Sequence, residues 1–169
     1  MIANILQHTP VWVWALFCGL LALGILQTRT RTVSKARATL LPIVMVLLSL
    51  NGVLSAFGPM PVAIGAWIVG LLVTLRVAAP WVEVRGGVWL PENDCFRVPG
   101  SWIPVSLIVA IFVTKYAAAV VLAMHPELAM NATVAGVLSL VYGSFAGLFW
   151  GRARSLLAHS RAGRAVVAA

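Results

Sequence analysis

Long apolar runs separated by short polar segments dominate the chain. Five of these runs reach the length of about 20 helical residues that crosses a hydrocarbon layer. They cover residues 10–27, 38–57, 62–79, 102–124 and 132–151. The pattern predicts an all-α membrane protein whose five transmembrane helices form one domain over residues 1–151, followed by a basic cytoplasmic tail over residues 152–169. That tail is expected either to extend the fifth helix or to lie along the inner membrane surface, and a frayed tail without regular structure is the alternative.

The segment between the third and fourth runs, residues 80–101, has a different pattern. β-Branched and aromatic residues gather in "GVWL" and "CFRV", and "PEND" between them is a typical turn sequence. We therefore expect a small cytoplasmic β-hairpin in this loop. Trp81, Trp89 and Trp102 are expected at the headgroup layer, and Ser101 is expected to be the N-cap of the fourth helix.

Small residues recur at a spacing of four in three of the runs. Such pairs let two helix backbones approach closely. We expect them to serve packing within the chain, and a homodimer seam is the alternative. The pairs are Ala15 and Gly19, Ala66 and Gly70, and Gly143 and Gly147.

The composition agrees with a lipid environment. Hydrophobic residues make up 62% of the 169 residues and charged residues 9%, with a mean hydropathy of +1.00. A soluble domain carries roughly a quarter charged residues, so this chain has too little polar surface for water. The net charge of +8 would suggest nucleic acid in a soluble protein. Here we expect no nucleic acid partner, because loops beside anionic lipid account for the basic residues.

The basic residues alternate between loops in a way that predicts the topology. Eleven of the 12 lie in the first loop, beside or within the third loop, or after the last run. None lies in the leader "MIANILQHTP", in "GPMP" or in "HPELAMN". Positive charge favours the cytoplasmic side, so we expect an outer N-terminus and a cytoplasmic C-terminus. A leader without Lys or Arg also argues against a signal peptide.

The remaining basic residue, Lys115, lies inside the fourth run, "LIVAIFVTKYAAAVVLA". At 1.5 Å per residue it lies about 20 Å from the inner end and about 14 Å from the outer end. A lysine at this depth needs a polar partner or a water-filled cleft. Counting to the same depth on the other runs brings Asn51 and Tyr142 to its level. Because no acid lies within an apolar run, we expect hydrogen bonds rather than an ion pair to hold the amine.

We interpret Lys115, Asn51 and Tyr142 as a candidate ligand-binding or proton-handling site. This makes a small binding or transport-like membrane protein the leading hypothesis. The same layer would also serve as interhelical hydrogen bonding without a ligand. The alternative function is a non-catalytic accessory or assembly factor that uses the hairpin and basic loops. Besides lipid, the partners left open are a second copy of the chain and another membrane protein.

No catalytic motif occurs, so we predict no enzyme, no catalytic residue and no cofactor. Cys18 and Cys95 are too far apart in sequence to suggest a metal site or a disulfide framework. His8 and His125 fall near predicted outer helix ends, where a metal or haem could bind. The spacing of the two histidines along the sequence does not favour such a site, and we predict no metal site.

Three segments carry a family resemblance: "ILQHTPVWVWALFCGLLALG", "KARATLLPIVMVLLSL" and "FRVPGSWIPVSLIVAIFVTKY". In them the chain resembles an uncharacterised family of small proteobacterial inner-membrane proteins and, more distantly, the CcdC-like group of multi-span proteins. The resemblance implies a multi-pass protein of the bacterial inner membrane, which would make the outer N-terminus periplasmic. It implies no settled activity and no site residues.

Overall fold

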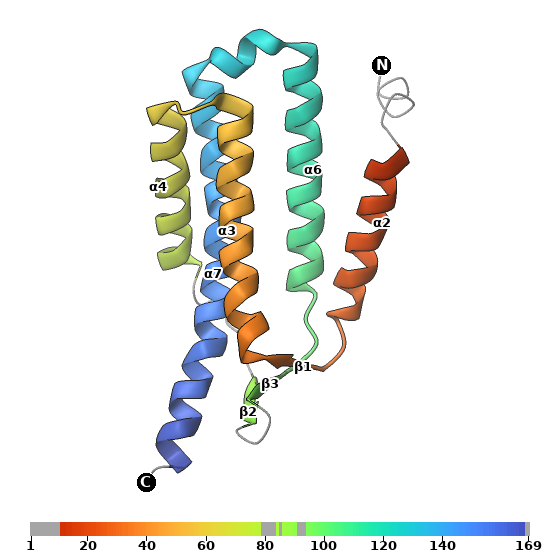
Figure 1. Ribbon diagram of the computed structural model, residues 1–169, viewed down its shortest axis with the longest axis vertical. Helices are drawn as coiled ribbons and strands as arrows, with labels where there is room; N and C mark the ends of the chain where they lie inside the picture. The colour runs from red at the N-terminus through yellow and green to blue at the C-terminus, as the bar shows by residue number, and fades with distance from the viewer. Residues whose placement is uncertain (1–10, 79–83, 85, 91–93, 168–169) are drawn as a thin grey trace.

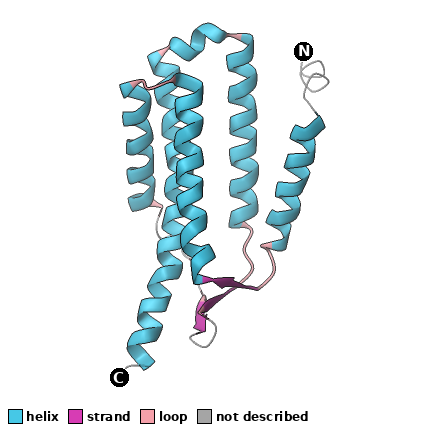
Figure 2. Ribbon diagram, viewed as in Figure 1, coloured by secondary structure: helices cyan, strands magenta, loops and turns pink. Residues whose placement is uncertain are grey.

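The computed structural model describes residues 11–78, 84, 86–90 and 94–167. Within these residues the chain forms five long helices, one short 3-10 helix and a small sheet at one end of the helices (Figures 1 and 2). The helices are α2 (Val11–Leu26), α3 (Lys35–Phe57), α4 (Pro61–Val77), α6 (Ile103–Met124), η2 (Pro126–Met130) and α7 (Ala132–Val167). The strands are β1 (Arg31–Ser34), β2 (Val88–Leu90) and β3 (Cys95–Val98).

Three of the helices are long and apolar enough to cross a membrane. They are Lys35–Phe57, Ile103–Met124 and the segment Ala132–Ala158 of α7. The helices α2 and α4 are also apolar but shorter, with 16 and 17 residues. The membrane character predicted from the sequence is therefore supported, and a crossing by α2 and α4 stays a prediction.

The predicted hairpin is confirmed, because β2 and β3 pair antiparallel. The structure adds a strand that the sequence did not predict. β1 comes from the first basic loop and pairs antiparallel with β3, which gives the order β1-β3-β2. Residues 91–93 of the expected turn lie outside the described part of the chain. Asp94 ends the turn with a φ of 49°, a left-handed conformation that aspartate tolerates.

The sheet has a small core of its own. Phe96 of the central strand is fully buried, and its ring lies 4.7 Å from that of Trp89. Ala38 of α3 and Leu156 of α7 pack on the same cluster. Trp89 is therefore a core residue of the sheet, whereas Trp102 is exposed. Trp81 lies outside the described residues, and the place of the three tryptophans at the headgroup layer stays a prediction. This core holds the sheet against the ends of two helices.

Local sequence explains where α3 and α4 meet. The Ser34 side chain accepts a hydrogen bond from the Arg37 backbone N–H at 3.3 Å and so caps α3. Gly58 ends that helix with a φ of 66°, which glycine adopts without strain. Pro61 then begins α4, at a position where the missing N–H costs no hydrogen bond.

The start of α6 differs from the prediction by one residue. Its N-cap is Trp102 rather than Ser101. The Ser101 hydroxyl nevertheless accepts a hydrogen bond from the Ile103 N–H at 3.2 Å. Ser101 therefore satisfies a free N–H of the first turn, although the helix begins one residue later.

The last helix is longer than the predicted span of 132–151. α7 continues to Val167 (Figure 1). Of the three alternatives for the tail, continuation of the helix is the one observed for residues 152–167. Beyond the apolar part, Leu156 packs in the sheet core, and the Ser155 hydroxyl accepts a hydrogen bond from the Val84 N–H at 3.0 Å.

The helices pack in two groups. α3 and α4 pack extensively on α7, and α2 packs chiefly on α6. Between α2 and α6, the rings of Phe17 and Phe112 stack with centroids 4.2 Å apart. The contacts between α6 and the three-helix group are much sparser.

Three of the predicted small residues, Gly70, Gly143 and Gly147, serve packing between α4 and α7. A Cβ at Gly70 would collide with the Leu140 carbonyl oxygen, and one at Gly143 with the Trp67 carbonyl oxygen. Gly147 lies in the same seam, with a Cβ position 2.6 Å from the Leu71 carbonyl oxygen. A Cβ at Gly19, in contrast, would meet no heavy atom within 4 Å. The bare backbones of α4 and α7 therefore touch, as the packing interpretation requires.

Candidate functional site

Lys115 reaches from α6 across the gap to the three-helix group. Its amine lies 5.2 Å from the centre of the Tyr142 ring on α7. It also approaches α3 at Gly52, where an added Cβ would lie 2.9 Å from the amine nitrogen. Within the described part of the chain, Lys115 makes no ion pair with an acid. The face of an aromatic ring attracts a cation, so Tyr142 supplies electrostatic contact where no carboxylate does.

The structure does not bring the third predicted residue to this contact. Asn51 directly precedes Gly52 on α3, but its side chain is exposed on the outer face of the helix. Among the residues that the structure describes, its amide makes no hydrogen bond to Lys115 or Tyr142. The depth count therefore placed Asn51 at the right level but not on the right face, because depth along a helix does not determine the direction of a side chain.

Two polar residues that the sequence analysis did not select lie beside Tyr142. The Ser49 hydroxyl donates to the Tyr142 carbonyl oxygen at 2.9 Å, and the Trp67 indole N–H donates to the Ser49 oxygen at 3.1 Å. These bonds join α3, α4 and α7 at one level. We call Ser49, Trp67, Lys115 and Tyr142 the polar cluster. In the sequence, Ser49 lies among leucines and Trp67 lies in an apolar run, which gives little reason to select either residue. Only their contacts in the structure identify them.

One further hydroxyl lies nearby without a partner. Ser139 is completely buried on α7, about one turn from Tyr142. Its hydroxyl makes no hydrogen bond with the part of the chain that the structure describes. A buried hydroxyl without a partner reduces stability, which makes Ser139 an informative position for mutation.

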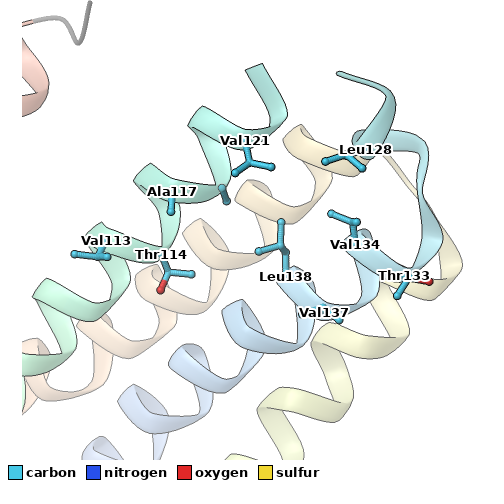
Figure 3. Close-up of a pocket in the computed structure, with 10 residues that line it drawn as sticks. Val113, Thr114, Ala117, Val121, Leu128, Thr133, Val134, Val137 and Leu138 are labelled. Atoms are coloured by element: carbon cyan, nitrogen blue, oxygen red, sulfur yellow. The ribbon is translucent and has the colours of Figure 1, made fainter. Parts of the chain in front are cut away.

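An apolar cleft lies between α6 and α7, closed at one end by η2 (Figure 3). Its volume is about 620 Å³, which is large enough for a small molecule. Only Thr114 and Thr133 bring hydroxyls to it, and the Thr114 hydroxyl already donates to the Ala110 carbonyl at 2.7 Å. The other lining residues are Val113, Ala117, Ala118, Val121, Leu128, Val134, Val137 and Leu138.

The cleft and the Lys115–Tyr142 contact belong to the same interhelical gap. Ala118 lines the cleft three residues after Lys115 on α6, and Leu138 lines it four residues before Tyr142 on α7. Residues three and four apart share a helix face. On α6, Thr114 and Ala117 line the cleft on either side of Lys115 in the sequence, so Lys115 lies at the level of the cleft although it is not itself a lining residue. An amphipathic molecule could place an apolar body in the cleft and a polar end near the amine.

The outer residues considered for a metal have other contacts or fall outside the structure. His8 lies outside the described residues. The His125 Nδ1 lies 3.1 Å from a carboxylate oxygen of Glu127. In the ranges that the structure describes, no group of three or more His, Cys, Asp or Glu side chains gathers in a way that could hold a metal.

The basic loops lie together at one end of the molecule. The β1 loop, the hairpin and the lower part of α7 are at the sheet end, opposite the α3–α4 turn and η2 (Figure 1). Exposed Arg29, Arg37, Arg97 and Arg154 belong to these segments. The separation of charge along the sequence therefore becomes a separation in space. Which membrane side this end faces stays a prediction.

A comparison with protein families finds one match that covers almost the whole chain. The model of a family of unknown function, DUF6622, matches residues 1–166. The protein is a member of the DUF6622 family. The sequence-based resemblance to an uncharacterised family is confirmed to this extent, and the CcdC-like resemblance and the bacterial origin stay predictions. No curated protein and no solved structure matches the chain. The DUF6622 family has no known function, so membership in it indicates no activity. The polar cluster and the cleft are the features of the structure that bear on function.

Proposed function

We propose that this DUF6622 protein is a five-span membrane protein that binds a small amphipathic molecule between α6 and α7. The ligand would have an apolar body and an anionic or hydrogen-bond-accepting end. A transport-like role follows if the two helix groups move apart to release it. We also propose the location expected from the sequence, an inner membrane with the sheet end in the cytoplasm.

One observation carries this proposal. The Lys115 amine lies between the two helix groups without an ion-pair partner in the described chain, and its neighbour Thr114 lines a cleft of about 620 Å³. An amine inside a membrane segment costs roughly 2.5–3.5 kcal/mol of insertion free energy. The contact with Tyr142 offsets only part of this cost, since a cation–π contact contributes about 0.5–2 kcal/mol. A bound acceptor would supply the remaining stabilisation.

Photolabelling tests the proposal directly. The probe is palmitic acid that carries a diazirine in its chain, added to the purified protein in mild detergent. We expect the label on peptides of α6 and α7. Ala117→Trp should abolish it by filling the cleft, and Lys115→Met should weaken binding roughly 10- to 100-fold through loss of a charge-assisted hydrogen bond. Leu72→Trp, at an exposed position of α4, is the matched control.

A second variant moves the amine without removing it. A methyl group at Gly52 would lie 2.9 Å from the Lys115 nitrogen, so Gly52→Ala should displace the end of this flexible side chain at little cost in stability. Binding should fall in Gly52→Ala and persist in Gly65→Ala, where an added Cβ meets no atom within 4 Å. Equal labelling of the parent, Ala117→Trp and Lys115→Met would contradict the proposal.

The accessory role remains the second candidate, and the sheet favours it. β1 and β2 are the edge strands of a three-stranded sheet that stands beside the basic loops. An exposed edge can pair with a strand of another protein. A native pull-down in mild detergent separates the two candidates. A co-purifying protein that depends on the sheet and not on Lys115 would favour the accessory role.

A further inference from the structure

The outer face of α3 carries a regular series of exposed residues. Successive members are four, three, four and three residues apart, which is the spacing of the a and d positions in a heptad repeat. The members are Leu40, Val44, Leu47, Asn51 and Leu54. The four apolar members have exposed fractions of 61%, 40%, 60% and 40% in chain order, and Asn51 is exposed as well. We call these five residues the α3 stripe.

The rest of the chain leaves the α3 stripe uncovered. The buried residues of the helix, such as Val53 and Phe57, pack in the core with α4 and α7. Lys115 approaches from a different side, at Gly52. The stripe therefore faces away from the helices of its own molecule. Lipid can cover its leucines at no cost, because lipid tails are as apolar as leucine.

Lipid cannot satisfy Asn51. This residue lies seven positions before Gly58, which is about 10 Å along the helix axis. Its short side chain cannot reach the headgroups over that distance, and its amide makes no hydrogen bond within the described chain. An amide in hydrocarbon without a partner is strongly unfavourable. The group that covers the stripe must therefore bring a donor and an acceptor to the depth of Asn51.

We infer that the α3 stripe is the contact surface between two copies of this chain. Two copies inserted in the same direction present their α3 helices in parallel, related by a two-fold axis along the membrane normal. The same amide then lies at the same depth on both sides, and each carbonyl oxygen can accept from the other amide. An asparagine at one a position, with leucines at d, favours a parallel pair and determines its register. Any other partner would need a polar group at this depth, whereas a second copy always has one.

Fluorescence energy transfer between labelled copies in liposomes tests the inference. The full-length protein is diluted over a range of protein-to-lipid ratios. We expect a dimer, with a dissociation constant raised roughly 5- to 30-fold by Asn51→Leu, since an interhelical hydrogen bond is lost. Leu47→Ala should also weaken the dimer. Leu72→Ala on α4, 50% exposed and outside the stripe, is the matched control and should have no effect.

Cysteine crosslinking provides a second measurement that does not depend on affinity. The native residues Cys18 and Cys95 are first replaced by serine. Val44→Cys and Asn51→Cys should then crosslink two copies, and Val69→Cys on α4 should not. A parent that stays monomeric at every lipid ratio overturns the inference. So does a dimer that Asn51→Leu and Leu47→Ala leave unchanged, or one that crosslinks through α4 instead of α3.

Discussion

The Lys115 amine lies 5.2 Å from the centre of the Tyr142 ring. This contact joins α6, which packs chiefly on α2, to α7 of the three-helix group. Ala118 and Leu122 of α6 also pack in the core with α3, α4 and α7, so Lys115 adds a polar contact to an otherwise apolar interface. The proposed ligand would bind beside this contact, and a relative movement of the two helix groups would change the contact.

Double-mutant cycles on Lys115 should separate its true neighbour from its expected one. Lys115→Met alone should insert and fold about as well as the parent, because it removes a cation from an apolar helix and keeps much of the apolar volume. When Lys115→Met is combined with Tyr142→Leu, the coupling free energy of the two substitutions should be about 0.5–2 kcal/mol. When Lys115→Met is combined with Asn51→Leu, the two changes in unfolding free energy should add within about 0.3–0.5 kcal/mol. Thermal unfolding in detergent measures both cycles, and a larger coupling to Asn51 would restore the three-residue layer expected from the sequence.

The half-buried Ser49 and the buried Ser139 should respond differently to alanine. Ser49→Ala leaves the Trp67 indole N–H without its acceptor, which should reduce the free energy of unfolding by about 1–3 kcal/mol. Ser139→Ala removes a hydroxyl for which the described chain supplies no partner. It should leave stability unchanged or raise it by up to about 1 kcal/mol. If Ser139→Ala proved the more harmful change, its hydroxyl would have a partner such as a bound water.

Glycine substitutions should locate the seam between α4 and α7. Gly70→Ala places a methyl group against the Leu140 carbonyl, so the helices must separate. We expect a loss of about 1–3 kcal/mol or more, typical of overpacking. Gly65→Ala on the same helix meets open space and should gain up to about 1 kcal/mol from helix propensity. Thermal unfolding of the two variants side by side is the measurement, and similar melting temperatures would argue against this seam.

The orientation is testable with reporter fusions. A reporter that is active only in the cytoplasm should signal when fused after Ala169, and one that is active only in the periplasm should be silent there. The reason is that eleven of the 12 basic residues lie in the sequence segments predicted to be cytoplasmic. The reverse result would invert the topology.

The outer end should show one measurable titration. The pKa of the Glu127 carboxyl is held below its ordinary value, chiefly by a hydrogen bond from its own backbone N–H and further by the His125 side chain. Its folded-state pKa is lowered, so its contribution to stability is present above the ordinary carboxyl pKa of about 4.3. It is lost as the pH falls through the lowered value. NMR titration should show the lowered pKa, and His125→Ala should raise it only part of the way. A full return to the ordinary value would mean that the backbone bond contributes nothing.

The sequence by itself determined the membrane character, the three longest helices, the hairpin and the separation of basic loops from loops without Lys or Arg. Each depends on local properties: the length of an apolar run, β-branched residues around a turn, or charge between helices. Gly70, Gly143 and Gly147 could also be predicted as packing sites, because small residues at a spacing of four admit a close neighbour.

Only the tertiary structure decided which partners meet. The sequence placed Asn51, Lys115 and Tyr142 at one depth, but the rotation of α3 turns Asn51 outward and brings Ser49 toward Tyr142 instead. β1 joins the sheet through a pairing with β3 that is distant in sequence. Depth follows from counting residues along one helix, whereas the facing of a side chain depends on how several helices rotate and pack together. Contacts between helices determine that rotation, such as the close backbone contact between α4 and α7 at their glycines. The sequence of a single segment does not specify such contacts.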